Sequence, residues 1–279
     1  MCGIFSILNS KYSGSDIDKT FKKGSARGPE SSTLLQFDEN SLVMGFHRLA
    51  INGFKNPKSE QPLNYKNCVL ICNGEIYNWK YLHDYLKIPK DSMSDCEIII
   101  HLYKKFGIEH TLDLLDGVFS FILYDKSNNE IFIARDTYGI RPLFIGISND
   151  TFIFSSIIKC ITPFFKYNSV SIEQFQPGTY SKFCKNATCW EVYIKNKIFS
   201  KPNYLINKNI SFDDSKKIIY DSLCNAVKKR IDNTDRPIAC LLSGGLDSSL
   251  ITALVKKFLP KNVELHTWSI GLKGPKNFF

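Results

Sequence analysis

Short apolar and alternating runs dominate the first two thirds of the chain, and most of them have the length of β-strands. Two pairs of runs flank turn-rich stretches, Asp-Lys-Ser-Asn-Asn at 125–129 and Ser-Asn-Asp at 148–150. Each pair therefore predicts a β-hairpin with antiparallel strands. Strands are predicted at residues 4–8, 42–51, 69–72, 118–124, 130–134, 144–147 and 152–154.

Two segments with helical signals interrupt these strands. Residues 78–86 predict a short helix. A second helix is expected to open at Ser94, where Glu97 three residues later completes a capping box, and its apolar face begins at Ile98. Hairpin strands with a few helices indicate an α+β domain with packed antiparallel sheets, which we assign to residues 2–185.

The pattern changes after this first domain. Residues 186–210 are polar and rich in Lys and Asn, so they predict a linker. From residue 211 onward a helical pattern is followed by a strand, a glycine-containing loop, a helix and another strand, the signature of a parallel α/β sheet. We assign residues 211–279 to the start of this second domain. Its later elements are predicted at residues 238–242, 247–258 and 263–270.

Composition narrows the class of protein. The 279 residues are 43% hydrophobic and 23% charged, which is ordinary for about two globular domains and argues against a disordered chain. No apolar run approaches the roughly 20 residues of a membrane-spanning helix. The net charge is +9, but only six residues are Arg and the Lys residues are scattered. A solvated basic surface therefore explains the charge better than nucleic-acid or membrane binding does.

Nine cysteines are spread along the chain without the dense spacing of a secreted disulfide scaffold. Cys184 and Cys189 lack the second pair that a zinc site would require, and none of the five histidines forms a ligand pair at helical spacing. The N-terminus lacks the charged and hydrophobic regions of a signal peptide. These features together predict a protein of the reducing cytoplasm.

The N-terminus carries candidate chemistry, because removal of Met1 would make Cys2 the first residue. Its α-amine, which titrates near pH 8, could then accept the proton of its own thiol. Taken alone, a Met-Cys start is better explained as an accident of sequence, with Cys2 as the first residue of an apolar strand. Three further segments add context: His-Arg-Leu-Ala at 47–50, Cys-Asn-Gly-Glu at 72–75 and Ser-Asp-Cys-Glu at 94–97.

With Arg-Gly-Pro-Glu at 27–30 and Arg-Asp-Thr-Tyr-Gly at 135–139, these segments resemble the glutamine amidotransferases of the N-terminal-cysteine class. They are most similar to the glutaminase domain of asparagine synthetases. The resemblance covers roughly the first 180 residues and implies the N-terminal-nucleophile type of fold.

The resemblance implies a role for each matching residue. Cys2 would be the nucleophile, and Asn73 and Gly74 would donate hydrogen bonds to the oxyanion. Arg48 would bind the α-carboxylate of glutamine and Asp95 its α-ammonium group. The implied glutamine pocket also contains Leu49, Ala50, Ile51, Asn52 and Glu75.

These residues also have ordinary structural interpretations. Arg48 could be a surface salt-bridge partner, and Asn73-Gly74 could form a type I′ turn, which that dipeptide favours. Asp95 could be a charge at a helix start, where the helix dipole favours anions. Arg135 and Asp136 could pair with each other and hold the fold.

The loop Ser-Gly-Gly-Leu-Asp-Ser-Ser at 243–249 follows a predicted strand and opens a predicted helix, as phosphate-binding loops do. It lacks the Gly-Lys-Ser/Thr ending of a Walker loop. It resembles the PP-loop of enzymes that cleave ATP to AMP and pyrophosphate, although a serine-capped turn is the structural alternative. The resemblance implies ATP contacts at Leu242, Ser243, Gly244, Gly245, Ser248, Ser249 and Ile270, with Asp247 as a candidate Mg²⁺ ligand.

Together the two halves resemble an enzyme that makes L-asparagine from L-aspartate, ATP and the ammonia of glutamine, with Mg²⁺ and without a prosthetic group. Ser-Ile-Gly at 269–271 leads into Leu-Lys-Gly-Pro-Lys-Asn-Phe-Phe, where the family has a longer helical region. We therefore expect glutaminase activity and an incomplete synthetase half. A free-standing glutaminase, an amidotransferase with another acceptor and a non-catalytic glutamine sensor stay open. So does the oligomeric state, a homodimer included.

Overall fold

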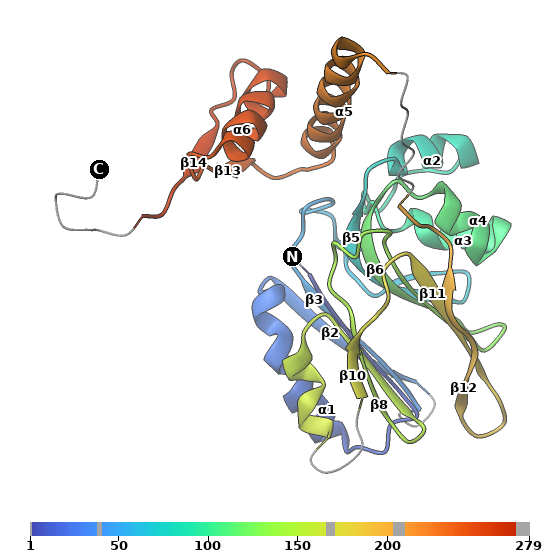
Figure 1. The fold of residues 1–279 in the computed structure, drawn as a ribbon. Helices are drawn as coiled ribbons and strands as arrows, with labels where there is room; N and C mark the ends of the chain where they lie inside the picture. Colours follow the sequence, from blue (N-terminus) through green and yellow to red (C-terminus); the bar gives the residue numbers. More distant parts are fainter. Residues whose placement is uncertain (1, 38–40, 166–170, 203–209, 272–279) are drawn as a thin grey trace. The chain divides into compact units, whose positions relative to one another are not determined.

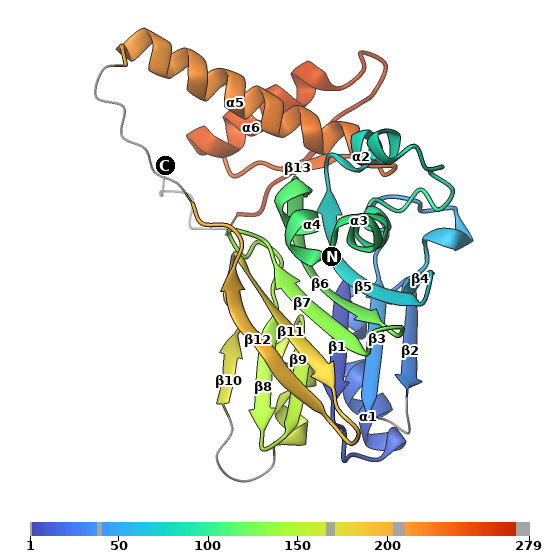
Figure 2. The same ribbon diagram turned by 90° about the vertical axis from the view of Figure 1, so that its right-hand side faces the viewer.

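The computed structural model describes residues 2–37, 41–165, 171–202 and 210–271, and the chain divides into two units, Met1–Tyr204 and Leu205–Phe279. Figures 1 and 2 show the elements of both units, which are described separately below. Among the described residues no helix is both long enough and apolar enough to cross a membrane.

Two antiparallel sheets form the first unit, and the strands of the first sheet include both predicted hairpin partners at 144–154. Its central strand is β1, which pairs with β3 on one side and β9 on the other. In spatial order the strands are β10 (Ser171–Gln174), β8 (Phe144–Ser148), β9 (Thr151–Ser155), β1 (Gly3–Leu8), β3 (Leu42–Arg48) and β2 (Ser31–Phe37).

The second sheet contains the other predicted hairpin, β6 and β7, at its centre. In spatial order its strands are β12 (Trp190–Ile198), β11 (Thr179–Lys185), β7 (Glu130–Arg135), β6 (Gly117–Asp125), β5 (Cys68–Ile76) and β4 (Leu63–Tyr65). Both faces of its central strands are apolar, because β6 is buried from Phe119 onward. Such continuous burial predicts that the sheet lies between two other layers.

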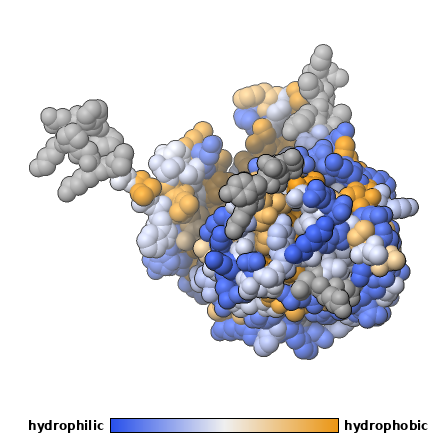
Figure 3. Space-filling model, turned by 90° about the horizontal axis from the view of Figure 1, so that it is seen from below, coloured by the Kyte–Doolittle hydropathy of each residue, from blue (hydrophilic) through white to orange (hydrophobic). Residues whose placement is uncertain are grey.

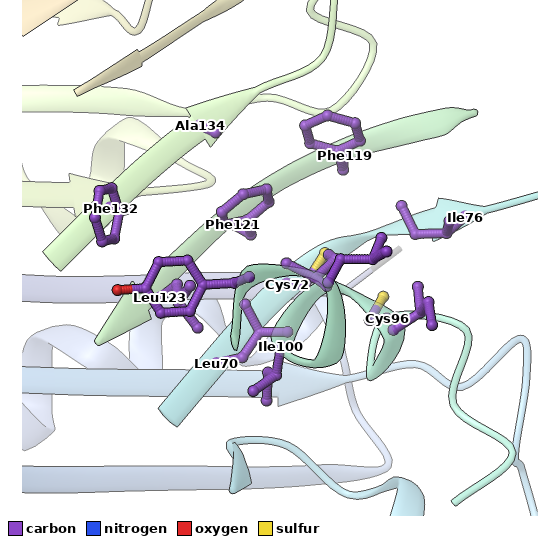
Figure 4. Packing of buried hydrophobic residues seen from close by; sticks show 14 of the residues in the cluster. Leu70, Cys72, Ile76, Cys96, Ile100, Phe119, Phe121, Leu123, Phe132 and Ala134 are labelled. Carbon is purple, nitrogen blue, oxygen red and sulfur yellow. The ribbon is translucent and has the colours of Figure 1, made fainter. Parts of the chain in front are cut away.

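Three hydrophobic clusters fill the spaces between four layers. One lies between the two sheets and contains Ile4, Met44 and Ile122. A second lies between the second sheet and helices α2–α4, and Figure 4 shows part of it. A third lies between the first sheet and α1 with the short helices near it. The helical elements are α1 (Gly14–Phe21), η1 (Lys22–Arg27), η2 (Pro57–Ser59), α2 (Trp79–Leu86), α3 (Ile98–Phe106), α4 (Ile108–Leu114), η3 (Ile158–Cys160) and η4 (Thr162–Phe164).

The N-terminal half thus has the predicted α+β fold with packed antiparallel sheets, but two local predictions are wrong. Helix α3 begins at Ile98 and not at Ser94, and the predicted capping box does not form. The Glu97 carboxylate instead accepts a hydrogen bond from Ser92 Oγ at 2.5 Å. The turn before α3 is held by a residue of strand β5, because Ile76 N–H donates to Asp95 Oδ2 at 2.8 Å.

The predicted linker at 186–210 also needs correction. Residues Trp190–Ile198 form strand β12, which pairs with β11 at the edge of the second sheet. Trp190 is buried in the core between the sheets, whereas most of the other β12 residues are exposed. The strand has the sequence Trp-Glu-Val-Tyr-Ile-Lys-Asn-Lys-Ile, and its apolar residues are easily overlooked because they lie in a stretch rich in Lys and Asn. Residues 203–209 of the predicted linker lie outside the described residues.

The second unit has the predicted strand–loop–helix–strand order. Strands β13 (Ala239–Leu241) and β14 (His266–Trp268) are parallel, and α6 (Leu246–Phe258) connects them, preceded by α5 (Phe212–Asp232). Its buried core consists of Val227, Leu254 and Val255, with partly buried neighbours.

Large apolar side chains lie on the surface of this unit. Leu241, Leu246 and Trp268 are 83%, 82% and 68% exposed, although the first and last belong to the parallel strand pair. Figure 3 shows hydrophobic patches on this part of the molecule. Parallel strands are normally covered on both faces, so the described residues form only part of an α/β layer structure.

Candidate active site

The predicted glutamine site is one pocket at the ends of three strands. It lies where β1 begins, where β3 ends and leads into the loop at 49–52, and along the last residues of β5; the turn before α3 closes it. The pocket is lined by Cys2, Phe46, Arg48, Leu49, Ala50, Ile51, Asn52, Ser59, Gln61, Cys72, Asn73, Gly74, Ser94, Asp95, Cys96 and Arg141. Segments far apart in sequence therefore meet here.

Cys2 immediately precedes β1 and is held by two backbone contacts. Its Sγ lies 3.4 Å from both the N–H and the carbonyl oxygen of Leu49, so the N–H can donate to sulfur and the thiol can donate to the carbonyl. The carbonyl of Cys2 accepts a hydrogen bond from Arg27 Nε at 2.8 Å. Burial raises the pKa of the Cys2 thiol, although the Leu49 N–H opposes this. A proton acceptor is therefore needed to make the thiolate.

Asn73 lies within β5 near its end, and its side chain reaches the pocket. Its side chain is almost fully buried, and its Nδ2 has no acceptor among the described residues. Because β5 continues to Ile76, Asn73-Gly74 does not form the type I′ turn that its sequence allows. A buried amide donor without a partner is costly unless a ligand accepts from it.

The register of β5 shows where the Gly74 N–H points. Gly74 lies opposite Phe119 of β6, whose N–H and carbonyl are both bonded to Asp136 on the far side of that strand. The Gly74–Phe119 pair is therefore a non-hydrogen-bonded pair, in which the Gly74 N–H and carbonyl face away from β6. Since β4 pairs only with Cys68, Val69 and Leu70, this edge of β5 is open at Gly74 and borders the pocket.

Glycine is required at position 74 by the neighbouring strand. A Cβ there would lie 2.9 Å from both Phe119 Cβ and the Val118 carbonyl oxygen, and 3.0 Å from Cys72 Sγ. These contacts are too close for any side chain. Gly74 thus keeps β5 close to β6 and leaves its own N–H accessible.

Arg48 is the last residue of β3 and is only 7% exposed. Its Nη2 donates to the Gly53 carbonyl at 3.0 Å and to Ser59 Oγ at 2.5 Å. Its Nη1 pairs with Glu60 Oε1 at 3.1 Å. Arg48 thus forms a salt bridge, as its structural interpretation predicts. It is, however, a buried residue of the pocket wall and not a surface residue.

Asp95 lies in the turn before α3, so it is not a charge within the first turn of that helix. It is 6% exposed, and Ile76 N–H donates to its Oδ2. Burial raises the pKa of Asp95 from 3.8 to about 6, against the effect of that hydrogen bond. An ammonium group beside this carboxylate would favour its charged form.

The remaining residues of the predicted pocket also lie at this site. Leu49, Ala50, Ile51 and Asn52 form one wall, and Ala50 N–H donates to Glu30 Oε2 at 2.8 Å. Glu75 does not line the pocket itself, but it pairs with Arg141, which does, through Arg141 Nη2. All nine residues predicted for glutamine, together with Cys2, thus come from one region of the first unit.

Arg135 and Asp136 order the loop that carries Arg141. Arg135 donates to the carbonyls of Gly139, Arg141 and Phe175 at 2.7–2.8 Å. The Asp136 carboxylate accepts from four backbone N–H groups, among them that of Arg141 at 3.1 Å. Both residues hold the fold, but through backbone groups and not by pairing with each other.

In the second unit, the predicted phosphate loop connects β13 to α6. Gly244 has φ +85°, a conformation that favours glycine, and Gly245 is the N-cap of α6 without a side-chain cap. The first N–H groups of α6 therefore lack a capping side chain and can bind an anion. Ser243 Oγ and Ser248 Oγ lie 3.0 Å apart across the loop.

The other residues predicted for ATP surround this loop. Asp247 and Ser249 are exposed in the first turn of α6, Leu242 N–H donates to the Trp268 carbonyl, and Ile270 is fully exposed just after β14. No group of three His, Cys, Asp or Glu residues suited to a metal ion occurs among the described residues. A lone carboxylate can still bind Mg²⁺ together with phosphate oxygens.

Sequence patterns did not single out several residues of the pocket. Ser59 and Gln61, with the Arg48 partner Glu60 between them, belong to a polar stretch typical of a loop, and Cys72 and Cys96 lie within apolar or helical patterns. Figure 4 labels Cys72 on β5 and Cys96 ahead of α3, in the core under the pocket. In the sequence, only the position of Cys72 next to Asn73 and of Cys96 next to Asp95 could have indicated a role.

Comparison with known proteins identifies the class. The family model for the glutamine amidotransferase domain matches residues 1–195, and that for asparagine synthase matches residues 219–278. The chain therefore belongs to the glutamine amidotransferase domain family. The fold is similar to that of glutamine phosphoribosylpyrophosphate amidotransferase from B. subtilis, with a TM-score of 0.56 at 19% identity over 92% of this chain and 64% of that chain.

Among individual proteins, the chain is similar to the glutamine-hydrolysing asparagine synthetases. It is 35% identical to the enzyme of Bos taurus, 36% to that of Mus musculus and 34% to that of Gallus gallus. Each match covers 98% of this chain and 52% of the relative. The chain thus spans about half the length of these relatives, comprising the glutamine amidotransferase half and the start of the synthetase domain.

Proposed function

We propose that the first unit hydrolyses L-glutamine to L-glutamate and ammonia, with Cys2 as nucleophile. The observation that carries this proposal is the pocket itself, in which a thiol, an unpartnered amide donor, a buried guanidinium and a buried carboxylate meet. A zwitterionic amino acid with a terminal carboxamide supplies a partner for each group.

The proposed reaction begins after removal of Met1, when the α-amine of Cys2 accepts the thiol proton. The thiolate attacks the side-chain carbonyl of glutamine, and Asn73 Nδ2 and the Gly74 N–H stabilise the oxyanion. The intermediate expels ammonia, which takes its proton from the ammonium group of Cys2, and leaves a thioester on Sγ. Water then attacks the thioester and releases glutamate.

Arg48 and Asp95 would select the substrate. Arg48 would bind the α-carboxylate with the N–H groups that its present partners leave available, and Asp95 would bind the α-ammonium group. Leu49–Asn52 and Glu75 would complete the pocket. The two opposite charges disfavour substrates that lack either group, because a buried charge would then lose its partner.

We further propose that the ammonia serves ATP-dependent synthesis of L-asparagine from L-aspartate. Support comes from the similarity to asparagine synthetases and from the glycine loop at the N-terminus of α6. Ser243, Gly244, Gly245, Ser248 and Ser249 would bind ATP phosphates, and Asp247 would bind Mg²⁺. Leu242 and Ile270 would contact the nucleotide. The reaction is that of a cytoplasmic ligase releasing AMP and pyrophosphate.

Glutamate release from L-glutamine, measured without ATP, tests the first proposal. We expect steady turnover by the wild-type chain and none above background after Cys2→Ala. Cys184→Ala is the matched control, because Cys184 is a half-buried cysteine of β11 outside the pocket. Glutamine binding without turnover by a folded wild-type chain that has lost Met1 would instead indicate a glutamine sensor.

A nitrogen source that bypasses the first site tests the second proposal. Asparagine formation from aspartate, ATP, Mg²⁺ and ammonium chloride depends on the loop at 243–249 and not on Cys2. We expect the chain, supplied with the rest of a synthetase domain, to lose this activity after Gly244→Val and to keep it after Cys2→Ala. Glutamate release without any ATP-linked product would favour a free-standing glutaminase.

A further inference from the structure

Between strands β4 and β5 of the second sheet, one backbone residue pair is replaced by a side-chain amide. Strand β4 pairs with β5 in antiparallel register, with Tyr65 opposite Cys68 and Leu63 opposite Leu70. Continuing this register would place residue 61 opposite Cys72, where a backbone pair would exchange two hydrogen bonds. Gln61 takes this place with its side-chain amide.

The contacts of the Gln61 amide replace both missing backbone bonds. Cys72 N–H donates to Gln61 Oε1 at 2.6 Å, and Gln61 Nε2 donates to the Cys72 carbonyl at 3.1 Å. Gln61 is 9% exposed, so these bonds are shielded from water. They fix the edge of β5 one residue before Asn73 and two before Gly74.

The two residues before Gln61 hold the opposite wall of the pocket. Ser59 Oγ and Glu60 Oε1 accept hydrogen bonds from Arg48, and Ser59 Oγ also donates to the Gly53 carbonyl at 2.6 Å. Residues 59–61, which we call the bridging segment, thus contact both the guanidinium and the edge of β5. This segment links the group proposed for the α-carboxylate to the groups proposed for the oxyanion.

We propose that Gln61 is a positioning residue for the oxyanion site: its amide replaces a strand at Cys72 so that Asn73 and Gly74 present their N–H groups at a fixed place. This inference rests on the proposed glutaminase function. The next position along the edge, Gly74, must stay unpaired for catalysis, so the sheet cannot simply be extended by a longer β4. With the Gln61 amide, the hydrogen bonds to this edge of β5 end at Cys72. The edge is therefore held in place while Gly74 stays unpaired.

Loss of the amide affects the transition state more than substrate binding. Oxyanion donors act only when the tetrahedral centre forms, and they act well only when their geometry is preorganised. Arg48 keeps its contacts to Ser59, Glu60 and Gly53 when the side chain at position 61 changes. We therefore expect a change in kcat, with little change in the KM for glutamine.

Two variants of Gln61 test this inference in the full chain. Gln61→Met keeps the length of the side chain and removes both hydrogen bonds, whereas Gln61→Glu keeps an acceptor for the Cys72 N–H and loses the donor to its carbonyl. We expect kcat for glutamate release to fall about 10- to 100-fold in Gln61→Met, somewhat less than the loss of a whole oxyanion donor. KM should change less than threefold. Gln36→Met, on the exposed surface of β2, is the matched control.

A transition-state analogue separates positioning from a merely structural role. An aldehyde analogue of glutamine forms a tetrahedral adduct with the Cys2 thiol, so its affinity should fall by the same factor as kcat/KM. The affinity for the product glutamate, which forms no adduct, should stay within threefold. Equal losses for aldehyde and glutamate, or wild-type kcat in a folded Gln61→Met, would overturn the inference. An inactive wild-type chain would contradict the proposed function instead.

Discussion

The two units differ in how deeply the polar groups of their candidate sites are buried. In the first unit, Arg48, Asn73 and Asp95 are less than 10% exposed and line one pocket. In the second, most of the phosphate loop is exposed, and apolar residues of both strands lie at the surface. A buried polar group without a partner is costly, and Asn73 Nδ2 has none among the described residues, which supports the proposal that this pocket binds a polar ligand.

This contrast indicates which chemistry the described residues can support by themselves. Preorganised donors in a water-poor pocket stabilise a developing charge far better than exposed donors do. The first unit has such a pocket within its own residues. The loop at 243–249 has anion-binding geometry, but among the described residues nothing shields it from water.

The largest effect in this comparison is expected from Asn73→Ala. Removal of one oxyanion donor should lower kcat for glutamine hydrolysis about 10²- to 10³-fold. The matched control, Asn64→Ala, removes an exposed amide of β4 and should leave kcat unchanged. Stopped assays of glutamate release measure both. An Asn73→Ala variant with more than half of wild-type kcat would show that the unpartnered amide has another purpose.

Arg48→Lys should have the next largest effect, and on a different constant. Lysine keeps the charge but cannot form the planar bidentate contact with a carboxylate. The KM for glutamine should rise about 10- to 100-fold, corresponding to about 1.5–3 kcal/mol for a hydrogen bond to a charged group. Arg230→Lys, on exposed α5, is the control. An unchanged KM would mean that Arg48 only supports the loop through Glu60, Ser59 and Gly53.

The pH dependence of kcat/KM for glutamine should show a smaller effect, which arises from the buried carboxylate of Asp95. Because the pKa of Asp95 is raised to about 6, its carboxylate is protonated as the pH falls through 6 and no longer binds an ammonium group. kcat/KM should therefore fall about tenfold per pH unit below 6, beyond the loss due to the α-amine, which titrates near pH 8. Asp95→Asn should lose the limb near pH 6 and keep the limb near pH 8.

The same raised pKa has the opposite sign for stability. The folded state binds this proton more tightly than the unfolded state does, so Asp95 contributes added stability as the pH falls from 7 to 5. Thermal unfolding at pH 5 should show that the Asp95→Asn variant has lost this contribution. An activity loss at pH 5 that parallels unfolding of the wild-type chain would contradict the assignment.

The smallest effect on glutamine hydrolysis is expected from the core of the second unit. Leu254→Ala should destabilise that unit by about 2–5 kcal/mol, since the side chain is buried, and leave kcat/KM for glutamine within twofold. Leu123→Ala makes the same change in the first unit and should lower the temperature at which glutaminase activity is lost. If Leu254→Ala abolished glutamate release, the first site would depend on the second unit.

Much of this architecture was predictable because hairpins and helical periodicity are local signals. The β6–β7 and β8–β9 hairpins, α2 and the parallel strand pair all follow from runs within the sequence. Strand β12 and the start of α3 did not follow, because the apolar residues of β12 lie within a stretch rich in Lys and Asn and because Asp95 is fixed by a distant strand. Tertiary contacts overrode both local patterns.

The same difference between local sequence signals and tertiary contacts applies to the residues of the candidate site. The residues proposed to act on glutamine directly, such as Cys2 and Arg48, belong to recognisable motifs and could be named from sequence. Gln61 could not, because its importance arises from the register between β4 and β5, where its amide takes the place of a residue pair. A polar residue in a loop-like stretch gives no sign of that contact.

Nucleophilic attack by Cys2 is tested most directly by mass spectrometry of the chain after brief reaction with glutamine and quenching in acid. If Cys2 is the nucleophile, the N-terminal peptide begins with Cys2 and carries a glutamyl thioester on its sulfur. Glutamate production by a chain that still begins with Met1, or a thioester on any other cysteine, would contradict this role of Cys2.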